Sequence, residues 1–308
     1  MSFDHTVLHG IIPPICTPLT PDGEIDVESA RRLVEFQLAA GVHGLFVLGS
    51  TGELAVLTAE QRRLMLETTV AAAAGRAPIL AGIFDTSTRR CIENGLMARA
   101  AGADAIVLAP PYYYRVGQRE LLEHFRAVRA AVELPILAYD VPGAVNVKLE
   151  AATVVALAEE GTICGLKDSS GDFHGFREVL MRTRHLPFRA FTGSELIVDS
   201  CIHMGAHGSV PGLGNVFPAE YVRLYELARA GDWAEAAAVQ ERLLACFREL
   251  ITQGDPGYSA SASALGGFKT GLKLKGVIAH TRVVEPLHSF TPAEEARVAD
   301  VMRRHGFL

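Results

Sequence analysis

Residues 78–109 read PILAGIFDTSTRRCIENGLMARAAGADAIVLA: a short apolar run, a segment of helical period and a second apolar run. The apolar runs 78–84 and 104–109 do not alternate with polar residues, as a strand with one solvent-exposed face would. Each predicted strand is therefore buried on both faces. The segment between them closes on Gly102, as helices with a glycine C-cap do. A strand, a crossover helix and a second strand together predict a parallel pair.

The same alternation recurs along the whole chain. Eight short apolar runs begin roughly 18 to 34 residues apart, which is the length of a βαβ unit. The runs are GIIPPICTPL (10–19), GLFVLGS (44–50), PILAGIF (78–84), DAIVLAPPYY (104–113), PILAYDV (135–141), TICGLKDS (162–169), FRAFTGSE (188–195) and HGSVPGL (207–213). Eight such units predict an α/β fold, the closed TIM (β/α)8 barrel, with an open doubly wound sheet as the alternative. No G-x-G-x-x-G follows the first run, which weighs against the open sheet.

The chain continues after the eighth run with about 80 residues of helical periodicity. We predict a barrel over residues 1–225 and a C-terminal helical extension over residues 226–308 that packs on the barrel. The clearest helical segments of the extension are 232–251, 263–279 and 291–306. No linker rich in Pro, Ser or Gly separates the two parts.

The composition is that of a globular chain with a sizeable core. Of the 308 residues, 49% are hydrophobic, and 29 basic residues stand against 35 acidic ones. The basic residues are scattered, so no stripe can neutralise nucleic-acid phosphates, and a small-molecule ligand is favoured. No apolar run is long enough for a membrane helix, and the first ten residues do not resemble a signal peptide. We therefore expect a cytoplasmic protein that contacts neither nucleic acid nor membrane.

Cysteines and histidines predict neither disulfides nor a metal centre. The five cysteines lie far apart in apolar stretches, which is typical of reduced residues in a core. The eleven histidines show no H-x-H or H-E-x-x-H spacing. We expect no metal and no cofactor.

Polar residues that end an apolar run are the candidates for chemistry, because active sites of such barrels lie at the C-terminal ends of the strands. Lys167 ends the run TICGLKDS and is one of only five lysines beside 24 arginines. Partial burial there would disfavour a charged amine, and a neutral amine attacks a ketone to form a Schiff base. The alternative is a strand-end lysine that reaches solvent or pairs with Asp168, and position alone leaves both open.

Tyr139 ends the neighbouring run PILAYDV, so its hydroxyl group and the Lys167 amine can face one cavity. A phenol in a dry pocket suits the proton transfers of imine formation, whereas the alternative is a ring that packs at the barrel rim. Ser50 and Thr51 lie in the turn GSTGE, where hydroxyl and N–H groups can meet a carboxylate or relay a proton. The alternative for that turn is a tight strand-to-helix connection without a ligand.

Six motifs occur in a fixed order on these eight units. They are GSTGE (49–53), PPYYY (110–114), YDVPG (139–143), GLKDSSGD (165–172), TGSE (192–195) and GSVPGLGN (208–215). Over roughly residues 8–305, the set resembles the dihydrodipicolinate synthase and N-acetylneuraminate lyase superfamily of pyruvate-dependent class I aldolases. The resemblance implies a lyase that holds pyruvate or a 2-oxo acid as a Schiff base, with a small aldehyde as partner substrate. It also implies a homotetramer built as a dimer of dimers.

The resemblance implies roles for single residues as well. Lys167 would form the Schiff base, and Tyr139 would donate and accept protons beside it. Ser50 would stand in a hydroxyl relay that Tyr113 completes across a dimer interface. The groups expected to line the substrate are Thr51 and Gly49 at the pyruvate carboxylate, Val210 through its backbone carbonyl near the imine, and Gly193 and Glu195.

Two departures from the family pattern bear on the substrate. The lysine-pathway synthases carry an Arg after the Y-x-V-P-x stretch that binds the carboxylate of the aldehyde, whereas Ala144 follows Gly143 here. The sialic-acid lyases carry an acidic pair after the seventh strand, whereas here Leu196 follows Glu195. A missing bidentate donor weakens carboxylate binding. We therefore expect a substrate with fewer hydroxyls, a 2-keto-3-deoxy sugar acid or a 4-hydroxy-2-oxo acid.

Several alternatives stay open at this point. Within the family they are dihydrodipicolinate (4-hydroxy-tetrahydrodipicolinate) synthase of lysine biosynthesis and a dehydratase that uses the same imine. Outside it they are a non-catalytic sugar-acid binding barrel and a barrel for a flavin or a sugar phosphate, in which GSVPGLGN would form the phosphate cup. An acyl-transfer triad is not supported, since no G-x-S-x-G occurs.

Overall fold

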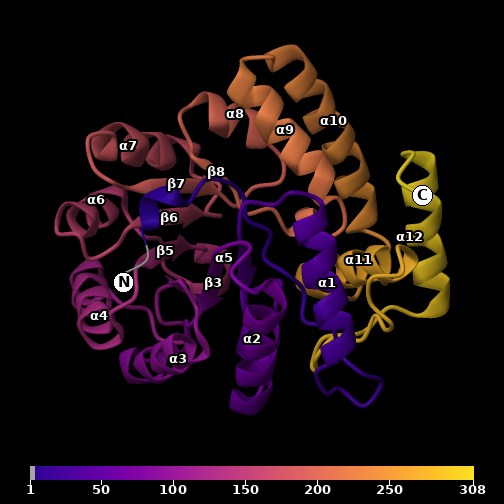
Figure 1. Ribbon diagram of the computed structural model, residues 1–308, viewed down its shortest axis with the longest axis horizontal. Coiled ribbons are helices and arrows are strands. Elements are labelled where there is room, and N and C mark those ends of the chain that lie inside the picture. The colour runs from indigo at the N-terminus through magenta and orange to yellow at the C-terminus, as the bar shows by residue number, and fades with distance from the viewer. Residues whose placement is uncertain (1–3) are drawn as a thin grey trace.

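The computed structural model of the chain describes residues 4–308. Its centre is a parallel sheet with the strand order β1-β8-β7-β6-β5-β4-β3-β2 (Figure 1). The strands are β1 (Gly10–Ile11), β2 (Leu45–Val47), β3 (Ile79–Gly82), β4 (Ala105–Leu108), β5 (Ile136–Asp140), β6 (Gly165–Asp168), β7 (Arg189–Thr192) and β8 (Gly208–Ser209). A parallel bridge between Pro14 and Phe46 links the first segment to β2, so the sheet curls round on itself. The predicted (β/α)8 barrel is confirmed.

Helices follow the strands and form the outer layer of the barrel (Figure 1). They are α1 (Val27–Ala39), α2 (Ala59–Ala73), α3 (Thr88–Ala101), α4 (Gln118–Val132), α6 (Ala151–Glu159), α7 (Phe173–Thr183) and α8 (Val198–His203). Shorter pieces are α5 (Pro142–Val145), η1 (His5–Val7), η2 (Leu54–Val56) and η3 (Gly212–Asn215). Local sequence sets the helix starts, as at α2, where the side chains of Thr58 and Gln61 each accept the other's backbone N–H in a capping box.

Glycines allow neighbouring strands to approach closely at two places in the barrel. A Cβ on Gly165 of β6 would lie 2.2 Å from the carbonyl oxygen of Arg189 on β7. A Cβ on Gly208 of β8 would lie 1.9 Å from the carbonyl oxygen of Gly10 on β1. Any larger residue at either position would push the strands apart. The core around them is apolar, and all five cysteines lie buried and free in the described chain, as predicted.

Four helices follow β8: α9 (Pro218–Ala230), α10 (Trp233–Leu250), α11 (Ala260–Leu274) and α12 (Pro292–Arg304). In Figure 1, α9 and α10 lie beside α8, and α11 and α12 lie on the side of α1. Two hydrogen bonds tie the segment after α11 to α1: Arg32 Nε donates to the Val277 carbonyl oxygen at 3.1 Å, and the Ala279 N–H donates to Ser29 Oγ at 3.0 Å. The predicted boundary after residue 225 lies inside α9, and the division into 1–225 and 226–308 stays a prediction.

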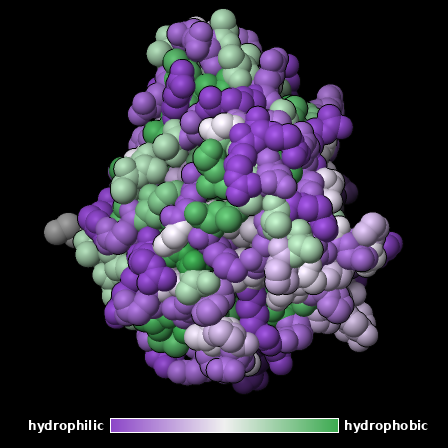
Figure 2. Space-filling model, turned by 90° about the vertical axis from the view of Figure 1, so that its right-hand side faces the viewer, coloured by the Kyte–Doolittle hydropathy of each residue, from purple (hydrophilic) through white to green (hydrophobic). Residues whose placement is uncertain are grey.

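The surface over the C-terminal helices is mixed in character. Figure 2 looks at the side on which α11 and α12 lie in Figure 1, and hydrophobic residues there form small groups among hydrophilic ones. Among the described residues, no helix is both long enough and apolar enough to cross a membrane.

A buried ion pair joins the C-terminal helices to the turn after β2. The carboxylate of Glu53 and the amine of Lys269, on α11, are in contact, and both side chains are fully inaccessible to solvent. Lys269 Nζ also donates to the Arg282 carbonyl oxygen at 2.6 Å, and the Val284 N–H donates to Glu53 Oε2 at 2.7 Å. Glu53 has a left-handed φ of 60°, which is costly for a non-glycine residue. The ion pair therefore helps to maintain the conformation of the turn.

Lys269→Met is expected to lower the free energy of unfolding by about 3–5 kcal/mol, because it leaves the Glu53 carboxylate buried and charged without a partner. The double variant Glu53→Gln, Lys269→Met removes both charges and should regain most of this loss. Chemical denaturation followed by circular dichroism gives both free energies. A double variant as unstable as the single one would show that charge pairing is not what stabilises the contact.

Candidate active site

The parallel register of β5 and β6 aligns Tyr139 with Lys167, so the two side chains point to the same face of the sheet. That face is the barrel interior. The ring of Phe46 lies near both side chains although its strand, β2, is separated from β5 by β3 and β4, and this is possible only across the inside of a curled sheet. The Phe46 ring centroid lies 6.4 Å from that of Tyr139 and 5.0 Å from Lys167 Nζ. The amine itself lies 4.2 Å from the Tyr139 ring centroid. The structure thus brings the predicted amine and phenol together inside the barrel.

Lys167 is almost completely buried, with 4% of its surface exposed. Among residues 4–308, no carboxylate oxygen lies within 4.0 Å of its amine. The pair with Asp168 does not form, since that carboxylate accepts from the N–H and the hydroxyl group of Ser170 at 2.8 and 2.7 Å. The amine meets the faces of two aromatic rings, which attract a cation only modestly. It is therefore not committed to a charged partner of its own chain.

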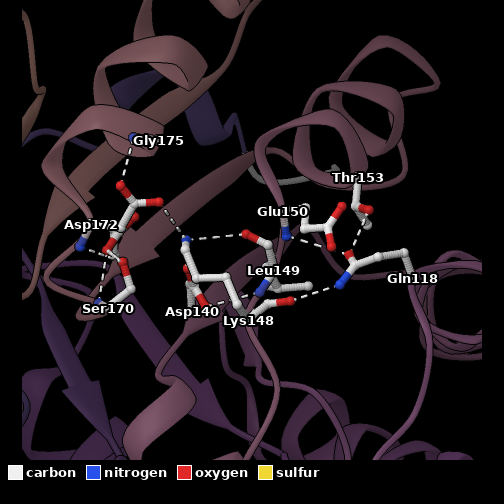
Figure 3. Close-up of polar contacts among 10 residues, drawn as sticks. Gln118, Asp140, Lys148, Leu149, Glu150, Thr153, Ser170, Asp172 and Gly175 are labelled. Atoms are coloured by element: carbon white, nitrogen blue, oxygen red, sulfur yellow. Dashed lines mark hydrogen bonds and ion pairs between the residues drawn. The ribbon is translucent and has the colours of Figure 1, made fainter.

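The next residues of the two strands, Asp140 and Asp168, point toward the helices, as alternate strand positions do. Lys148 forms an ion pair with Asp140 and lies 3.8 Å from Asp172 (Figure 3). The N–H of Leu149 donates to the second oxygen of Asp140 at 3.0 Å. Burial raises the pKa of Asp140, and the hydrogen bond from Lys148 opposes that rise. Lys148 is therefore engaged on the helix side of the strands rather than in the barrel.

The turn after β2 packs against the same aromatic ring as the amine. A Cβ on Gly49 would lie 2.8 Å from Phe46, so only glycine lets the turn approach the ring this closely. Ser50 is exposed and Thr51 is partly exposed. Because Phe46 contacts both Gly49 and the surroundings of Lys167, the turn presents Ser50 and Thr51 at the end of the barrel that holds the amine.

Two further loops reach the amine from β7 and β8. A Cβ on Gly193 would lie 3.1 Å from Lys167 Cε, which places the backbone after β7 directly against the lysine. The N–H of Val210 donates to the carbonyl oxygen of Thr192 at 2.8 Å, so the buried Val210 stands beside the same loop.

Within the described residues, no three His, Cys, Asp or Glu side chains are grouped so as to hold a metal ion.

Glu195 is held by backbone groups and by a side chain of the C-terminal helices. Its Oε1 accepts from the Gly212 N–H at 2.6 Å, and its carbonyl oxygen accepts from Gln240 Nε2, on α10, at 2.8 Å. Burial of the carboxyl group raises the pKa of Glu195, and hydrogen bonds from backbone N–H groups, including that of Gly212, act against that rise. The carboxyl group is therefore fixed between the loops that follow β7 and β8.

Comparison with known proteins places this geometry in a family. The family model described as "Dihydrodipicolinate synthetase family" matches residues 7–305. The chain belongs to this family. It is 32% identical over 301 residues to a 4-hydroxy-tetrahydrodipicolinate synthase of Aromatoleum aromaticum, covering 97% of this chain and 99% of that relative. A synthase of the same name from Exiguobacterium sibiricum is 34% identical over 281 residues, covering 90% and 96%.

Solved structures of the dihydrodipicolinate synthetase family have the same fold. Dihydrodipicolinate synthase from Bacteroides thetaiotaomicron has a TM-score of 0.91 and 36% identity, covering 99% of this chain and 100% of that one. A prophage protein of the family from E. coli K12, solved in complex with pyruvate, has a TM-score of 0.90 and 29% identity, covering 98% and 99%. The chain is thus an enzyme of a family of pyruvate-dependent class I aldolases and lyases, as the motifs predict.

One residue of the family pattern is not part of the cluster around Lys167 within a single chain. Tyr113 is 78% exposed and has a left-handed φ of 91°. Its ring contacts that of Tyr114 at right angles, with the centroids 5.1 Å apart. The role of Tyr113 across a dimer interface stays a prediction.

Sequence reasoning missed the aromatic residues around the phenol. Phe46 and Phe84 both make T-shaped contacts with Tyr139, with ring centroids 6.4 and 5.9 Å away. They lie in the apolar runs 44–50 and 78–84, where they look like ordinary core residues. Counting alternate positions along each predicted strand is the signal that could have placed them inside the barrel.

Gly193→Ala is expected to slow pyruvate-dependent chemistry by about 10²-fold. The new methyl group would clash with Ser169 Oγ, 2.0 Å away, and crowd Lys167 Cε, and a shift of about 1 Å in a reacting group costs that much. The readout is the rate at which the protein exchanges the methyl protons of pyruvate for deuterium in D2O, followed by NMR. Gly143→Ala is the matched control, because a Cβ there meets no atom within 4 Å. Undiminished exchange in a well-folded Gly193→Ala protein would contradict this role of the loop.

Proposed function

We propose that Lys167 forms an imine with the 2-oxo group of pyruvate, and that the enamine derived from it makes or breaks a C–C bond with an aldehyde. The observation that supports this most directly is the position of the amine. It is buried in the barrel, 4.2 Å from the Tyr139 ring centroid, with no carboxylate within 4.0 Å in the described chain. An amine that no carboxylate of its own chain engages is available to attack a bound ketone.

The proposed reaction begins with attack of the neutral Lys167 amine on C2 of pyruvate, which gives a carbinolamine after proton transfer to the carbonyl oxygen. Loss of the hydroxyl group as water, with a proton from the Tyr139 hydroxyl, leaves a protonated imine. The imine withdraws electrons, so the Tyr139 phenolate removes a C3 proton and an enamine forms. C3 then attacks the aldehyde carbon, the aldehyde oxygen takes up a proton, and hydrolysis of the imine frees the amine. The same steps in reverse cleave C3–C4 of a 2-oxo acid.

We assign the remaining contacts of the substrate to the three loops at this end of the barrel. The turn at Gly49 and Thr51 would hold the pyruvate carboxylate, since backbone N–H groups and a hydroxyl suit an anionic oxygen. The Val210 carbonyl oxygen would face the imine, and Gly193 and Glu195 would line the rest of the substrate. The closeness of Gly193 to Lys167 Cε and the hydrogen bond that holds the Glu195 carboxylate at the Gly212 N–H support this assignment.

The hydroxyl relay is proposed to need a second copy of the chain. Ser50 is exposed, and its relay partner would be Tyr113 of a neighbouring subunit in a homotetramer built from dimers. Two observations on Tyr113 support this: its 78% exposure and its left-handed φ, a strained conformation that a subunit contact would stabilise.

Two reactions remain candidates for this chain: the synthase reaction and the cleavage of a 2-oxo acid. The relatives are named 4-hydroxy-tetrahydrodipicolinate synthase, and this favours the synthase reaction over the 2-oxo acid lyase expected from the sequence. One feature of the chain favours the lyase. Ala144 stands where the synthases have a carboxylate-binding Arg, and Lys148, the next basic residue, is paired with Asp140 on the helix side. A lost bidentate contact to a desolvated carboxylate is worth about 2–5 kcal/mol. A dehydratase on the same imine stays an alternative.

The variant Ala144→Arg is expected to raise kcat/KM for the synthase reaction by about tenfold or more, because it supplies a guanidinium group for the carboxylate of the aldehyde. Ala144 is exposed, so the fold should tolerate the change. Ala144→Gln is the control, because it adds a polar side chain without a charge. Release of pyruvate from 2-keto-3-deoxy acids and 4-hydroxy-2-oxoglutarate is measured in parallel. Efficient synthase turnover in the unmodified protein, with no gain in Ala144→Arg, would decide for the synthase.

Tyr139→Phe is expected to slow pyruvate methyl exchange in D2O by about 10²-fold or more, the scale of a lost general acid or base. The ring is retained, so its contacts with Phe46 and Lys167 and the thermal stability should change little. NMR gives the exchange rate, and a thermal melt confirms folding. Exchange at the normal rate in the folded variant would remove Tyr139 from the proton transfers.

A further inference from the structure

The opposite end of the barrel holds a second hollow, of about 420 Å³. It lies at the starts of β7 and β8, because Arg189 is the first residue of β7 and His207 directly precedes β8. The polar residues that line it are Arg189, Arg229, His9, His207, Tyr225 and Thr6. Lys167 stands near the other end of β6, so this hollow is separate from the site proposed for pyruvate.

The charge of this hollow is one-sided. Arg189 and Arg229 both line it, and no acidic side chain does. Among residues 4–308, neither guanidinium group has a carboxylate oxygen within 4.0 Å. An adjoining hollow of about 240 Å³ shares Arg189 and His207 and adds Arg184, a third cation. Cations that converge without acidic partners repel one another, and an anion between them removes that cost.

Arg189 also has hydrogen-bonding capacity that the described chain does not use. One terminal nitrogen donates to the Thr6 carbonyl oxygen at 2.5 Å. Its Nε is buried and has no partner among residues 4–308. A guanidinium group presents its N–H donors as a rigid fork that matches carboxylate and phosphate oxygens. An oxyanion in the hollow is therefore a suitable ligand for the donors of Arg189 that the described chain leaves unused.

The neutral side chains of the hollow are suited to the same ligand. His207 Nδ1 accepts from the Ala190 N–H at 3.1 Å, so neutral His207 carries its proton on Nε2 and can donate it. Burial lowers the pKa of His207, and the charges of Arg189 and Arg229 lower it further. Burial raises the pKa of Tyr225, and the same two arginines oppose that rise. The geometric link between the two guanidinium groups is that both line the same hollow as His207 and Tyr225.

We propose that this hollow binds a small oxyanion, a phosphate or a carboxylate, between Arg189 and Arg229, with His207 and Tyr225 as neutral donors. Asp4 caps η1 through Thr6, and those hydrogen bonds are the main cause of its lowered pKa, which the charge of Arg189 also helps to lower. Asp4 is not among the residues that line the hollow. His9 Nδ1 donates to the Val7 carbonyl oxygen at 2.8 Å. Its Nε2 is therefore the nitrogen that can face the hollow or solvent.

The test measures binding to the full-length protein by isothermal titration calorimetry with inorganic phosphate, succinate and chloride. We expect saturable binding of phosphate or succinate and none of chloride, and the tighter of the two identifies the class of oxyanion. Arg229→Gln should raise the Kd of the bound oxyanion by about tenfold, which is the effect of one lost charge-assisted contact. Arg229 lies exposed near the end of α9, so this variant should fold normally.

Arg223→Gln is the matched control, because it removes the same charge from an exposed position of the same helix. It should leave Kd unchanged within about twofold, a difference too small for a lost direct contact. Equal weakening in both variants would reduce the effect to net charge, and unchanged binding in Arg229→Gln would place the anion elsewhere. Either result, or no saturable binding of phosphate and succinate, overturns the proposal. Because the readout is binding and not turnover, its failure leaves the proposed imine chemistry untouched.

Discussion

The hydrogen-bond register between β5 and β6 is the constraint on which the proposed chemistry depends. With Tyr139 aligned to Lys167, both project into the barrel, where Phe46 and Phe84 pack around the phenol. A slip of either strand by one residue would turn its reactive side chain toward the helices and bring the acidic neighbour, Asp140 or Asp168, inside. Burial of both faces of these strands makes such a slip costly, because every apolar side chain would change sides. The geometry of the amine and the phenol is therefore a property of the sheet rather than of a flexible loop.

The loops around the amine are tied to the C-terminal helices. Glu53 belongs to the same turn as Ser50 and Thr51, and its buried ion pair with Lys269 anchors that turn to α11. Gln240 of α10 holds the backbone of Glu195 after β7. Two of the three loops at this end thus have a partner far downstream in the sequence. The extension consequently contributes to the position of the site as well as to stability.

Patterns within short stretches of sequence predicted the barrel and the cluster at its end, because strand period and strand-end position are local properties. Lys167 and Tyr139 could be paired from sequence since both end apolar runs on consecutive strands. The ion pairs of Glu53 with Lys269 and of Lys148 with Asp140 could not, because each depends on which way a side chain turns in the folded chain. The sequence also does not predict that Arg189 and Arg229 line one hollow, because 40 positions separate them. The proposed role of Tyr113 involves a second copy of the chain, and only the family resemblance, not a local pattern, suggested it.

The most direct measurement is to treat the protein with pyruvate and borohydride, digest it and locate the added mass by peptide mass spectrometry. Hydride reduces an imine to a stable secondary amine, so the modified lysine keeps the pyruvate skeleton. The chain has only five lysines, which makes the site unambiguous. Because the amine is buried and has no carboxylate within 4.0 Å among residues 4–308, we predict that the peptide containing Lys167 carries the added mass and that the other four lysines do not. Label on another lysine, or no label at all, would contradict the imine on Lys167.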